Sequence, residues 1–320
     1  MANQPLAHAC DRVLSLAMRP WAITRPMLSV VAQILGHRLA GDPLELSALE
    51  RRPPVDPVAE GGVAILPVHG VLAPRLNMMS EISGGTTYDR LGHQLGLAMK
   101  NPDIRTIVLD IDSPGGSATG ATELAAQLRA ARDTKRIIAL ANHEMCSAAF
   151  WLGAQATEIV ASPSAILGSL GVYSIHEDLS AALEKAGIKL TYISAGKYKT
   201  DGNEAEPLSD SARARIKSLV DATYSRFVGD VALGRERPEA TIRNGYGEGT
   251  VVTAEEGLAL GMVDRIETFA QTVARVLPSG ARLAPLDAAA PAPAPPAPVD
   301  KPALAAQVLA RQRAILALGL

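Results

Sequence analysis

Cysteine, aromatic residues and surplus charge are all scarce in this chain of 320 residues. The two cysteines, Cys10 and Cys146, are too few for a disulfide framework or a cysteine-based zinc site, and they fit a reducing compartment. Lysine and arginine number 31 against 33 acidic residues, so no overall field would hold the chain on nucleic acid or on an anionic membrane. We therefore expect neither of these among its partners.

Long apolar runs and metal-binding patterns are missing as well. No stretch reaches the roughly 18 uncharged apolar residues of a membrane span, and the N-terminus lacks the ordered regions of a secretory signal. The scattered histidines never form the His-Glu-x-x-His pattern of a zinc enzyme. The sequence thus predicts a cytoplasmic protein that needs no metal and no cofactor.

Changes in composition divide the chain into four predicted segments. Residues 1–57 carry apolar residues at near-helical spacing, so we expect a helical N-terminal segment, closed by a breaker-rich linker near 51–62. Residues 58–280 alternate short β-branched runs with Ala/Leu-rich stretches, which is typical of an α/β domain. Residues 281–303 form a Pro/Ala-rich linker, and 304–320 could be a short amphipathic helix that docks on a partner or frays.

Most predicted strands are uninterrupted apolar runs, as expected of strands covered on both faces. The predicted strands are Val63–Val68, Thr106–Ile111, Arg136–Ala141, Glu158–Ala161, Gly171–Ser174, Lys189–Ile193 and Met262–Ile266. The predicted helices are 87–100, 118–132, 147–156, 178–186, a longer one capped by Ser209, and one from Thr253 to Leu260. The long helix carries an apolar stripe that we interpret as core packing, made of Ile216, Leu219, Val220, Thr223, Phe227 and Val231.

Two strand-to-helix turns carry the residues that could do chemistry. The first, DIDSPGGS at 110–117, has two glycines that permit a sharp turn and leave N–H groups open to an anion. The second, HEMCSAAF at 143–150, places Ser147 where a helix N-terminus could stabilise an oxyanion. Either could instead be only a turn or a helix cap. Cys146 is a competing nucleophile that also reads as a small buried apolar residue.

A serine nucleophile needs a base, and the sequence offers two kinds. His143 or His176 could pair with Ser147. Alternatively, Lys197 or Lys199 could act as a neutral amine, provided that burial lowers the lysine pKa from about 10.4 towards the working pH. Spacing alone does not choose between the two.

Six motifs, taken in order, resemble the signal peptide peptidase A-like serine peptidases: VAILPVHG, DIDSPGG, MCSAAFWLGAQA, LGSLGV, SAGKYKTDGN and TAEEGLALGMVD. They cover about residues 63–266. Within the family, the CSA motif, the KTDGN motif and the lack of a membrane anchor make the chain most similar to phage head maturation proteases of the phage lambda type. The resemblance implies a fold like that of Clp protease and crotonase, built of stacked β-β-α units.

The resemblance also assigns roles to individual residues. It implies that Ser147 is the nucleophile, that Lys199 is its general base, and that Ser169 orients the lysine amine. Lys197 is then a solvated neighbour.

An oxyanion hole is implied by the same resemblance, with donors from Gly115 or Gly116 and from Ala148. The implied activity is that of a serine endopeptidase working through an acyl-enzyme. Its substrates would be scaffold, portal or capsid proteins in the prohead, and it would act as a homo-oligomer.

Two other functions stay open on the sequence. A crotonase-type acyl-CoA enzyme would use a similar pair of turns to stabilise an enolate without a Ser/Lys pair. A non-catalytic assembly protein could keep the peptidase fold and have lost the chemistry.

Overall fold

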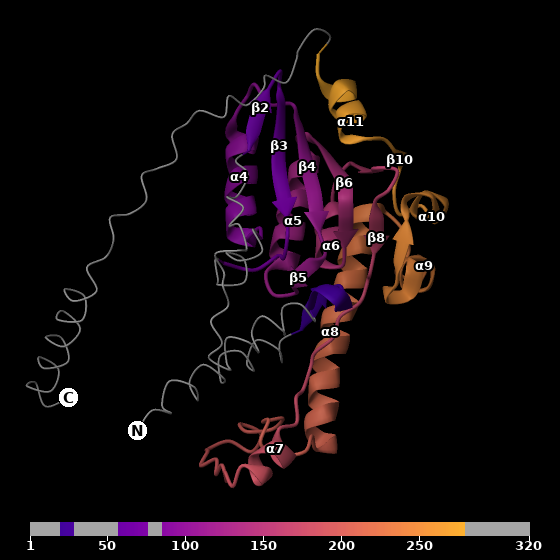
Figure 1. Ribbon diagram of the computed structural model, residues 1–320. Helices are drawn as coiled ribbons and strands as arrows, with labels where there is room; N and C mark the ends of the chain where they lie inside the picture. Colours follow the sequence, from indigo (N-terminus) through magenta and orange to yellow (C-terminus); the bar gives the residue numbers. More distant parts are fainter. Residues whose placement is uncertain (1–19, 29–56, 76–84, 279–320) are drawn as a thin grey trace, which may run out of the picture. The chain divides into compact units, whose positions relative to one another are not determined.

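The computed structural model describes residues 20–28, 57–75 and 85–278 (Figure 1). The predicted Pro/Ala linker at 281–303, the helix at 304–320 and most of the predicted helical segment at 1–57 lie outside these residues. Residues 20–28, which belong to that N-terminal segment, contain a short strand and one helical turn.

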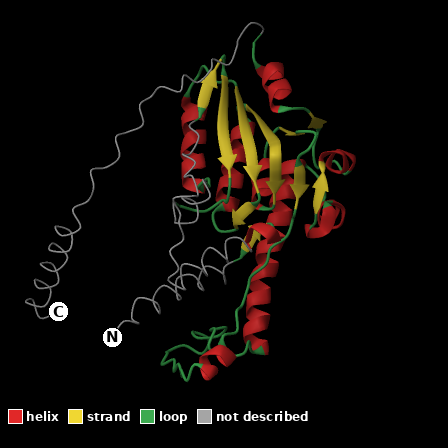
Figure 2. Ribbon diagram, viewed as in Figure 1, coloured by secondary structure: helices red, strands yellow, loops and turns green. Residues whose placement is uncertain are grey.

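Strands and helices alternate along the described chain, which confirms the α/β class (Figure 2). The strands are β1 Trp21–Ile23, β2 Val58–Glu60, β3 Val63–His69, β4 Thr106–Ser113, β5 Gly115–Ser117, β6 Arg136–Cys146, β7 Glu158–Ala161, β8 Ile166–Gly168, β9 Val251–Thr253 and β10 Arg265–Ile266. The α-helices are α4 Tyr88–Lys100, α5 Ala121–Arg132, α6 Ala148–Gly153, α7 Ser180–Lys185, α8 Asp210–Arg235, α9 Glu239–Gly245, α10 Ala254–Ala259 and α11 Phe269–Val276.

An eight-stranded sheet forms the centre of the fold, with strand order β10-β7-β6-β4-β3-β2. Strands β3, β4, β6 and β7 pair in parallel, and β2 pairs antiparallel with β3. Farther along β6, its last residues pair with β8, which in turn pairs with β9. Because parallel strands share one direction, the turns after β4 and β6 lie at the same edge of the sheet.

Alternating side chains of the central strands divide the core between the two sheet faces. Leu66, Leu109 and Ala139 are buried in one cluster with residues of α4, α5, α6 and α8. Val108 and Ile138 belong to a second cluster, against which partly buried residues of α11 pack. Both faces of the central strands are therefore apolar, which explains why the sequence shows uninterrupted runs instead of alternation.

The long predicted helix is confirmed as α8, and the Ser209 side chain caps it by accepting the N–H of Ala212 at 3.2 Å. Its last third is core, because Phe227 is fully buried and stacks on Trp151 with ring centroids 4.4 Å apart. The apolar stripe does not stay in the core towards the helix N-terminus, where Leu219 is 54% exposed. The prediction that the whole stripe is core packing is wrong for that part.

The exposed part of α8 belongs to a segment that we call the arm, residues 175–226. Ala212 alone among the described residues of the arm is buried. The arm includes α7 and extends away from the sheet along α8 (Figure 1). Nearly all of the arm is therefore accessible to another protein.

Three predicted strands differ from the structure. Residues 171–174 make only an isolated bridge at Tyr173, and 189–193 are an exposed loop of the arm without a strand partner. The last predicted strand shrinks to β10. The predicted linker at 51–62 also contains β2, which is held by pairing with β3. These differences have one cause: a segment with suitable residues becomes a strand only where a neighbouring strand lies close enough to pair with it.

The other predicted strands and helices are present in the structure, whereas β5, β8, β9, α9 and α11 were not predicted. The other predicted strands appear as β3, β4, β6 and β7, and the helices predicted at 87–100, 118–132, 147–156 and 178–186 appear as α4, α5, α6 and α7. The Thr253 capping box at the start of α10 is present. Within the described ranges, no helix combines the length and apolar composition needed to cross a bilayer.

Candidate active site

Ser147 occupies a strained turn between β6 and α6. Its φ of 55° and ψ of −118° lie outside the regions that a non-glycine residue usually adopts. The turn is fixed by two backbone hydrogen bonds: Ser147 N–H donates to Gly168 O at 2.7 Å, and Trp151 N–H donates to Ser147 O at 2.9 Å. The Ser147 side chain makes no capping bond to α6 and instead places Oγ 3.5 Å from Gly171 O. The helix-cap reading of Ser147 is therefore wrong.

The glycine turn after β4 lies directly against the serine turn. An added Cβ at Gly115, where φ is +96°, would lie 2.9 Å from the backbone nitrogen of Ala148. An added Cβ at Gly116 would come within 1.9 Å of Leu72 O. Both glycines are needed here because the backbone approaches its neighbours too closely for any side chain. The two turns that the sequence singled out thus meet at one place.

The predicted oxyanion donors differ in what their N–H groups already do. Gly115 N–H donates to Ser113 Oγ at 3.2 Å, and that hydroxyl donates to Gly70 O at 2.6 Å. Ala148 is the first residue of α6, so its N–H has no acceptor within the helix. Ala148 is consequently the best-placed donor for an oxyanion formed beside Ser147.

Gly116 is engaged by β1. The antiparallel register pairs Ala22 with Gly116, and the flanking bonds are Thr24 N–H to Pro114 O at 3.0 Å and Ala118 N–H to Pro20 O at 3.3 Å. Hydrogen-bonded pairs occur at every second residue of an antiparallel ladder, so Ala22 and Gly116, which lie midway between these two bonds, form a hydrogen-bonded pair. The N–H of Gly116 is therefore directed at Ala22 O.

Ser169 lies beside Ser147, in the turn that follows β8. Its φ is 54°, and its N–H donates to Thr250 O at 2.7 Å. Gly168, directly before it, and Gly171, two residues after it, are the residues whose carbonyl oxygens contact Ser147. The structure therefore gathers Ser169 with Ser147 and with the oxyanion candidates.

Lys199 does not lie with Ser147 and Ser169. It is an exposed residue of the arm, and its N–H donates to Gly196 O at 3.0 Å. In the described part of the chain no hydrogen bond or ion pair joins Lys199 to Ser147 or Ser169. The Nζ atom of the nearby Lys197 lies 5.0 Å from the centroid of the Tyr198 ring, at the surface.

Neither candidate histidine pairs with Ser147. His143 Nδ1 lies 3.3 Å from Asp112 Oδ2, and His176 Nε2 lies 3.1 Å from Asn203 O, within the arm. Both rings are thus held by other groups, which disfavours the Ser/His alternative.

Cys146 is fully buried, as the sequence suggested. Burial, together with the neighbouring Glu144 carboxylate, raises the pKa of the Cys146 thiol far above its usual range. Little thiolate can form at neutral pH, so Cys146 is a poor nucleophile. The described residues also contain no group of three or more His, Cys, Asp or Glu arranged to hold a metal ion.

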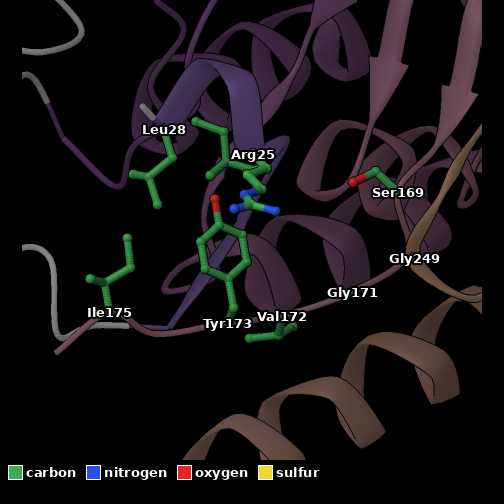
Figure 3. A pocket seen from close by; sticks show the side chains of 9 residues that line it. Arg25, Leu28, Ser169, Gly171, Val172, Tyr173, Ile175 and Gly249 are labelled. Carbon is green, nitrogen blue, oxygen red and sulfur yellow. The ribbon is translucent and has the colours of Figure 1, made fainter. Parts of the chain in front are cut away.

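A pocket of about 580 Å³ opens beside the serine turn (Figure 3). It is lined by Ile23, Arg25, Leu28, Ser169, Gly171, Val172, Tyr173, Ile175 and Gly249. Burial raises the pKa of Tyr173 to about 12, although the positive charge of Arg25 acts in the opposite direction. The pocket therefore offers an apolar wall with a neutral phenol and one cation.

Residues 129–280 match the family described as Peptidase family S49. The matched region belongs to peptidase family S49. It contains the serine turn, Ser169, Lys199 and the arm, but not the glycine turn at 115–116. The resemblance noted from the motifs is thereby confirmed.

Curated relatives of the chain include two phage proteins. The chain is 35% identical to capsid assembly protease C of Escherichia phage lambda, over 67% of this chain and 49% of that protein. It is 34% identical to head-tail preconnector protein GP5 of Enterobacteria phage P21, over 64% of this chain and 40% of that protein. The chain thus spans at most about half the length of these relatives.

Likeness to solved structures is weaker. A mutant of the membrane-bound stomatin-specific protease 1510-N aligns with a TM-score of 0.42 at 15% identity, over 68% of this chain and 85% of that chain. An enoyl-CoA hydratase from Polaromonas sp. JS666 aligns with a TM-score of 0.41 at 16% identity, over 69% and 74% of the two chains.

The motifs did not indicate two parts of the candidate site. Ser113, which holds the glycine turn through its buried hydroxyl, lies inside the DIDSPGG motif but was given no role. Strand β1 was read as part of a helical segment. Its signal was present in the sequence, because Trp21 and Ile23 favour strands and stand between Pro20 and Pro26.

Proposed function

We propose that this S49 chain is a serine endopeptidase that cleaves peptide bonds through an acyl-enzyme on Ser147. The observation that carries the proposal is the meeting of the two turns, where the backbone nitrogen of Ala148 adjoins Gly115 and Ser147 Oγ makes no capping bond to its own helix. A nucleophile beside a helix N-terminus and an unpaired N–H is the arrangement that acyl transfer needs.

The proposed reaction uses Lys199 as a neutral amine. It takes the proton of the Ser147 hydroxyl as Oγ attacks the scissile carbonyl carbon, and the oxygen of that carbonyl becomes an oxyanion held by the Ala148 N–H and the glycine turn. The lysinium then protonates the leaving amine as the C–N bond breaks. Water repeats the relay and releases the second product, which restores Ser147 and Lys199. Ser169 is proposed to orient the lysine amine.

Lys199 must reach Ser147 for this reaction, and we propose that it does so in a second copy of the chain. The arm that carries Lys199 runs into α8, a continuous helix of 26 residues, so bringing the lysine to the serine of its own chain would require a bend in that helix. The arm also exposes several large apolar residues, namely Ile188, Leu190, Tyr192, Ile193 and Tyr198. Exposed apolar groups of this density favour contact with another protein, here a neighbouring copy.

The proposed substrates are scaffold, portal or capsid proteins of a phage head. Support comes from the relatives, whose names are capsid assembly protease C and head-tail preconnector protein GP5. The chain would then act in the prohead or in the cytoplasm of the host.

Co-expression with candidate head proteins tests this function. We expect specific shortening of one or more head proteins on a gel with the wild-type chain, and none with Ser147→Ala. The matched control is Ser225→Ala, because Ser225 is exposed on α8 and should not affect processing. Processing that continues in Ser147→Ala would rule out the acyl-enzyme. Acyl-CoA turnover that survives the same substitution would favour the crotonase-type alternative, and normal assembly without processing in Lys199→Ala would favour an assembly protein.

A further inference from the structure

Strand β1 is bonded along both of its edges to elements of the candidate active site. On one edge it pairs antiparallel with β5, from Trp21 opposite Ser117 to Ile23 opposite Gly115. On the other edge, Trp21 N–H donates to Tyr173 O at 2.9 Å, and Tyr173 N–H donates to Trp21 O at 3.1 Å. The segment 20–24 is thus the middle of three extended segments, between the glycine turn and residues 171–173.

Its backbone passes through the place where a scissile peptide would have to lie. Ala22 O is only 2.3 Å from the position of an added Cβ at Gly115, and Ala148 N is 2.9 Å from the same position. The pairing of Ala22 with Gly116 also occupies one of the predicted oxyanion donors. Ser147 itself is completely buried. A substrate cannot enter this space while β1 is there.

We propose that β1 is an internal competitor for the substrate: it fills the groove between β5 and residues 171–173, and a substrate peptide binds there as an extended strand only after β1 has left. The proposal rests on the proposed function. Its chemical basis is that the edges of β5 and of residues 171–173 supply backbone donors and acceptors at the spacing of a strand, which any extended peptide can use. Specificity would then come from the side-chain positions of Trp21 and Ile23.

The way β1 is held suits an element that leaves without unfolding the domain. The strand has three residues, and its two large side chains, Trp21 and Ile23, pack in a small cluster with Leu28 and Val71, so that only the methyl group of Ala22 belongs to the main core. Releasing so small a cluster exposes little apolar surface compared with opening the main core, so local opening should be much easier than global unfolding.

Trp21 provides a direct signal for this release. The chain has two tryptophans. The other, Trp151, is fully buried, and its Nε1 donates to Asp230 Oδ2 at 2.9 Å, so it should give a constant background. The experiment uses the full-length chain carrying Ser147→Ala, which binds without cleaving. The probe is a synthetic peptide with the sequence of residues 18–28 in which Phe replaces the tryptophan.

We expect this peptide to cause a saturable red shift of Trp21 emission as β1 is displaced. The matched control peptide has proline in place of Ala22, which removes the N–H that pairs with Gly116 and should abolish the shift. A full-length chain that also carries Ile23→Ala should bind the first peptide about tenfold more tightly, because its internal competitor is weaker. Leu97→Ala, on the exposed side of α4, should leave the affinity unchanged.

Three results would overturn the proposal: no binding of the peptide, binding without a Trp21 shift, or equal affinities in the Ile23→Ala and parent chains. Near-ultraviolet circular dichroism from Trp151 verifies that each variant keeps its core. Failure of the proposed function looks different, because the Ser147→Ala chain would then bind the peptide with the expected shift while the wild-type chain processes no head protein.

Discussion

At the residue scale, the site depends on two adjacent positions that have no room for a side chain. Gly115 needs φ of +96°, and its Cα adjoins the backbone of both Ala22 and Ala148. Gly116 is closer still to a neighbour, since a methyl group there would meet Leu72 O. Leu72 belongs to the main core and is fully buried, so it cannot retreat without disturbing its own neighbours.

Gly116→Ala should therefore lower the free energy of unfolding by about 3 kcal/mol, because the added methyl group overlaps a fixed carbonyl oxygen. Urea unfolding followed by circular dichroism measures the effect. The matched control is Gly96→Ala in α4, where an added Cβ meets nothing within 4 Å and should raise stability by about 0.5–1 kcal/mol. Similar changes in both variants would show that the close approach at Gly116 is relieved cheaply.

The sequence could indicate candidate residues where a motif contains them, but it could not indicate contacts that arise only from packing. Ser147, Ser169 and the two glycines lie in the motifs and meet in space. The role of Ser113 depends on the carbonyl of Gly70, which follows a different strand, and nothing in the sequence near Ser113 signals that contact.

At the element scale, one buried carboxylate links β7 to the strands β6 and β10 and to the helix α11. Glu158, at the start of β7, accepts hydrogen bonds from Arg136 of β6, Arg265 of β10 and Arg275 of α11. Burial alone would raise the pKa of Glu158, but the three guanidinium groups outweigh it and hold the pKa below its usual range. The ionised form of Glu158 is thus stabilised in the folded state.

Glu158→Gln should lower the free energy of unfolding at pH 7 by about 2 kcal/mol, the typical size of hydrogen bonds to a charged group. Because the folded-state pKa is lowered, the stabilisation is present above the unfolded pKa of about 4.3 and is lost as pH falls through the folded pKa. The gap between wild type and variant should therefore close as the solution is acidified. Denaturant midpoints measured from pH 7 down to pH 3 follow this.

A parallel series on Glu184→Gln, at an exposed position of α7, should show almost no gap at any pH. A Glu158→Gln gap that persisted undiminished in acid would mean that the effect comes from packing and not from charge.

Helices were more predictable than strands for a physical reason. The caps of α8 and α10 involve residues three positions apart, so sequence alone reports them. A strand requires a partner that the local sequence does not contain. Residues 189–193 have the composition of a strand but pair with no strand of the described residues, whereas β1 pairs with two segments that come much later in the sequence.

At the scale of the whole molecule, the proposed nucleophile and the proposed base belong to different parts of the structure. Ser147 is buried at the edge of the sheet, and Lys199 is exposed on the arm. Motifs could indicate both residues. Their separation in space depends on how the whole chain folds, and the number of residues between the two motifs does not reveal it.

Mixing two inactive chains should therefore restore activity. Ser147→Ala lacks the nucleophile and Lys199→Ala lacks the base, yet a site that combines the serine of one with the lysine of the other is complete. In randomly mixed oligomers about a quarter of the sites would have this combination. Head-protein processing by co-expressed variants measures the recovery.

The double variant Ser147→Ala/Lys199→Ala, mixed with either single variant, should stay inactive. Absence of recovery in mixed oligomers that do form would show that a neighbouring copy does not supply the lysine.

The position of β1 near the start of the chain has a consequence for biosynthesis. Trp21, Ala22 and Ile23 leave the ribosome early, but their partners in β5 and at Tyr173 are translated only much later. The strand β1 can therefore complete its pairing only after residue 173 has been synthesised, while core residues of α8 such as Phe227 are translated later still. Until that point, a growing polypeptide would carry β1 with at most one of its two edges paired.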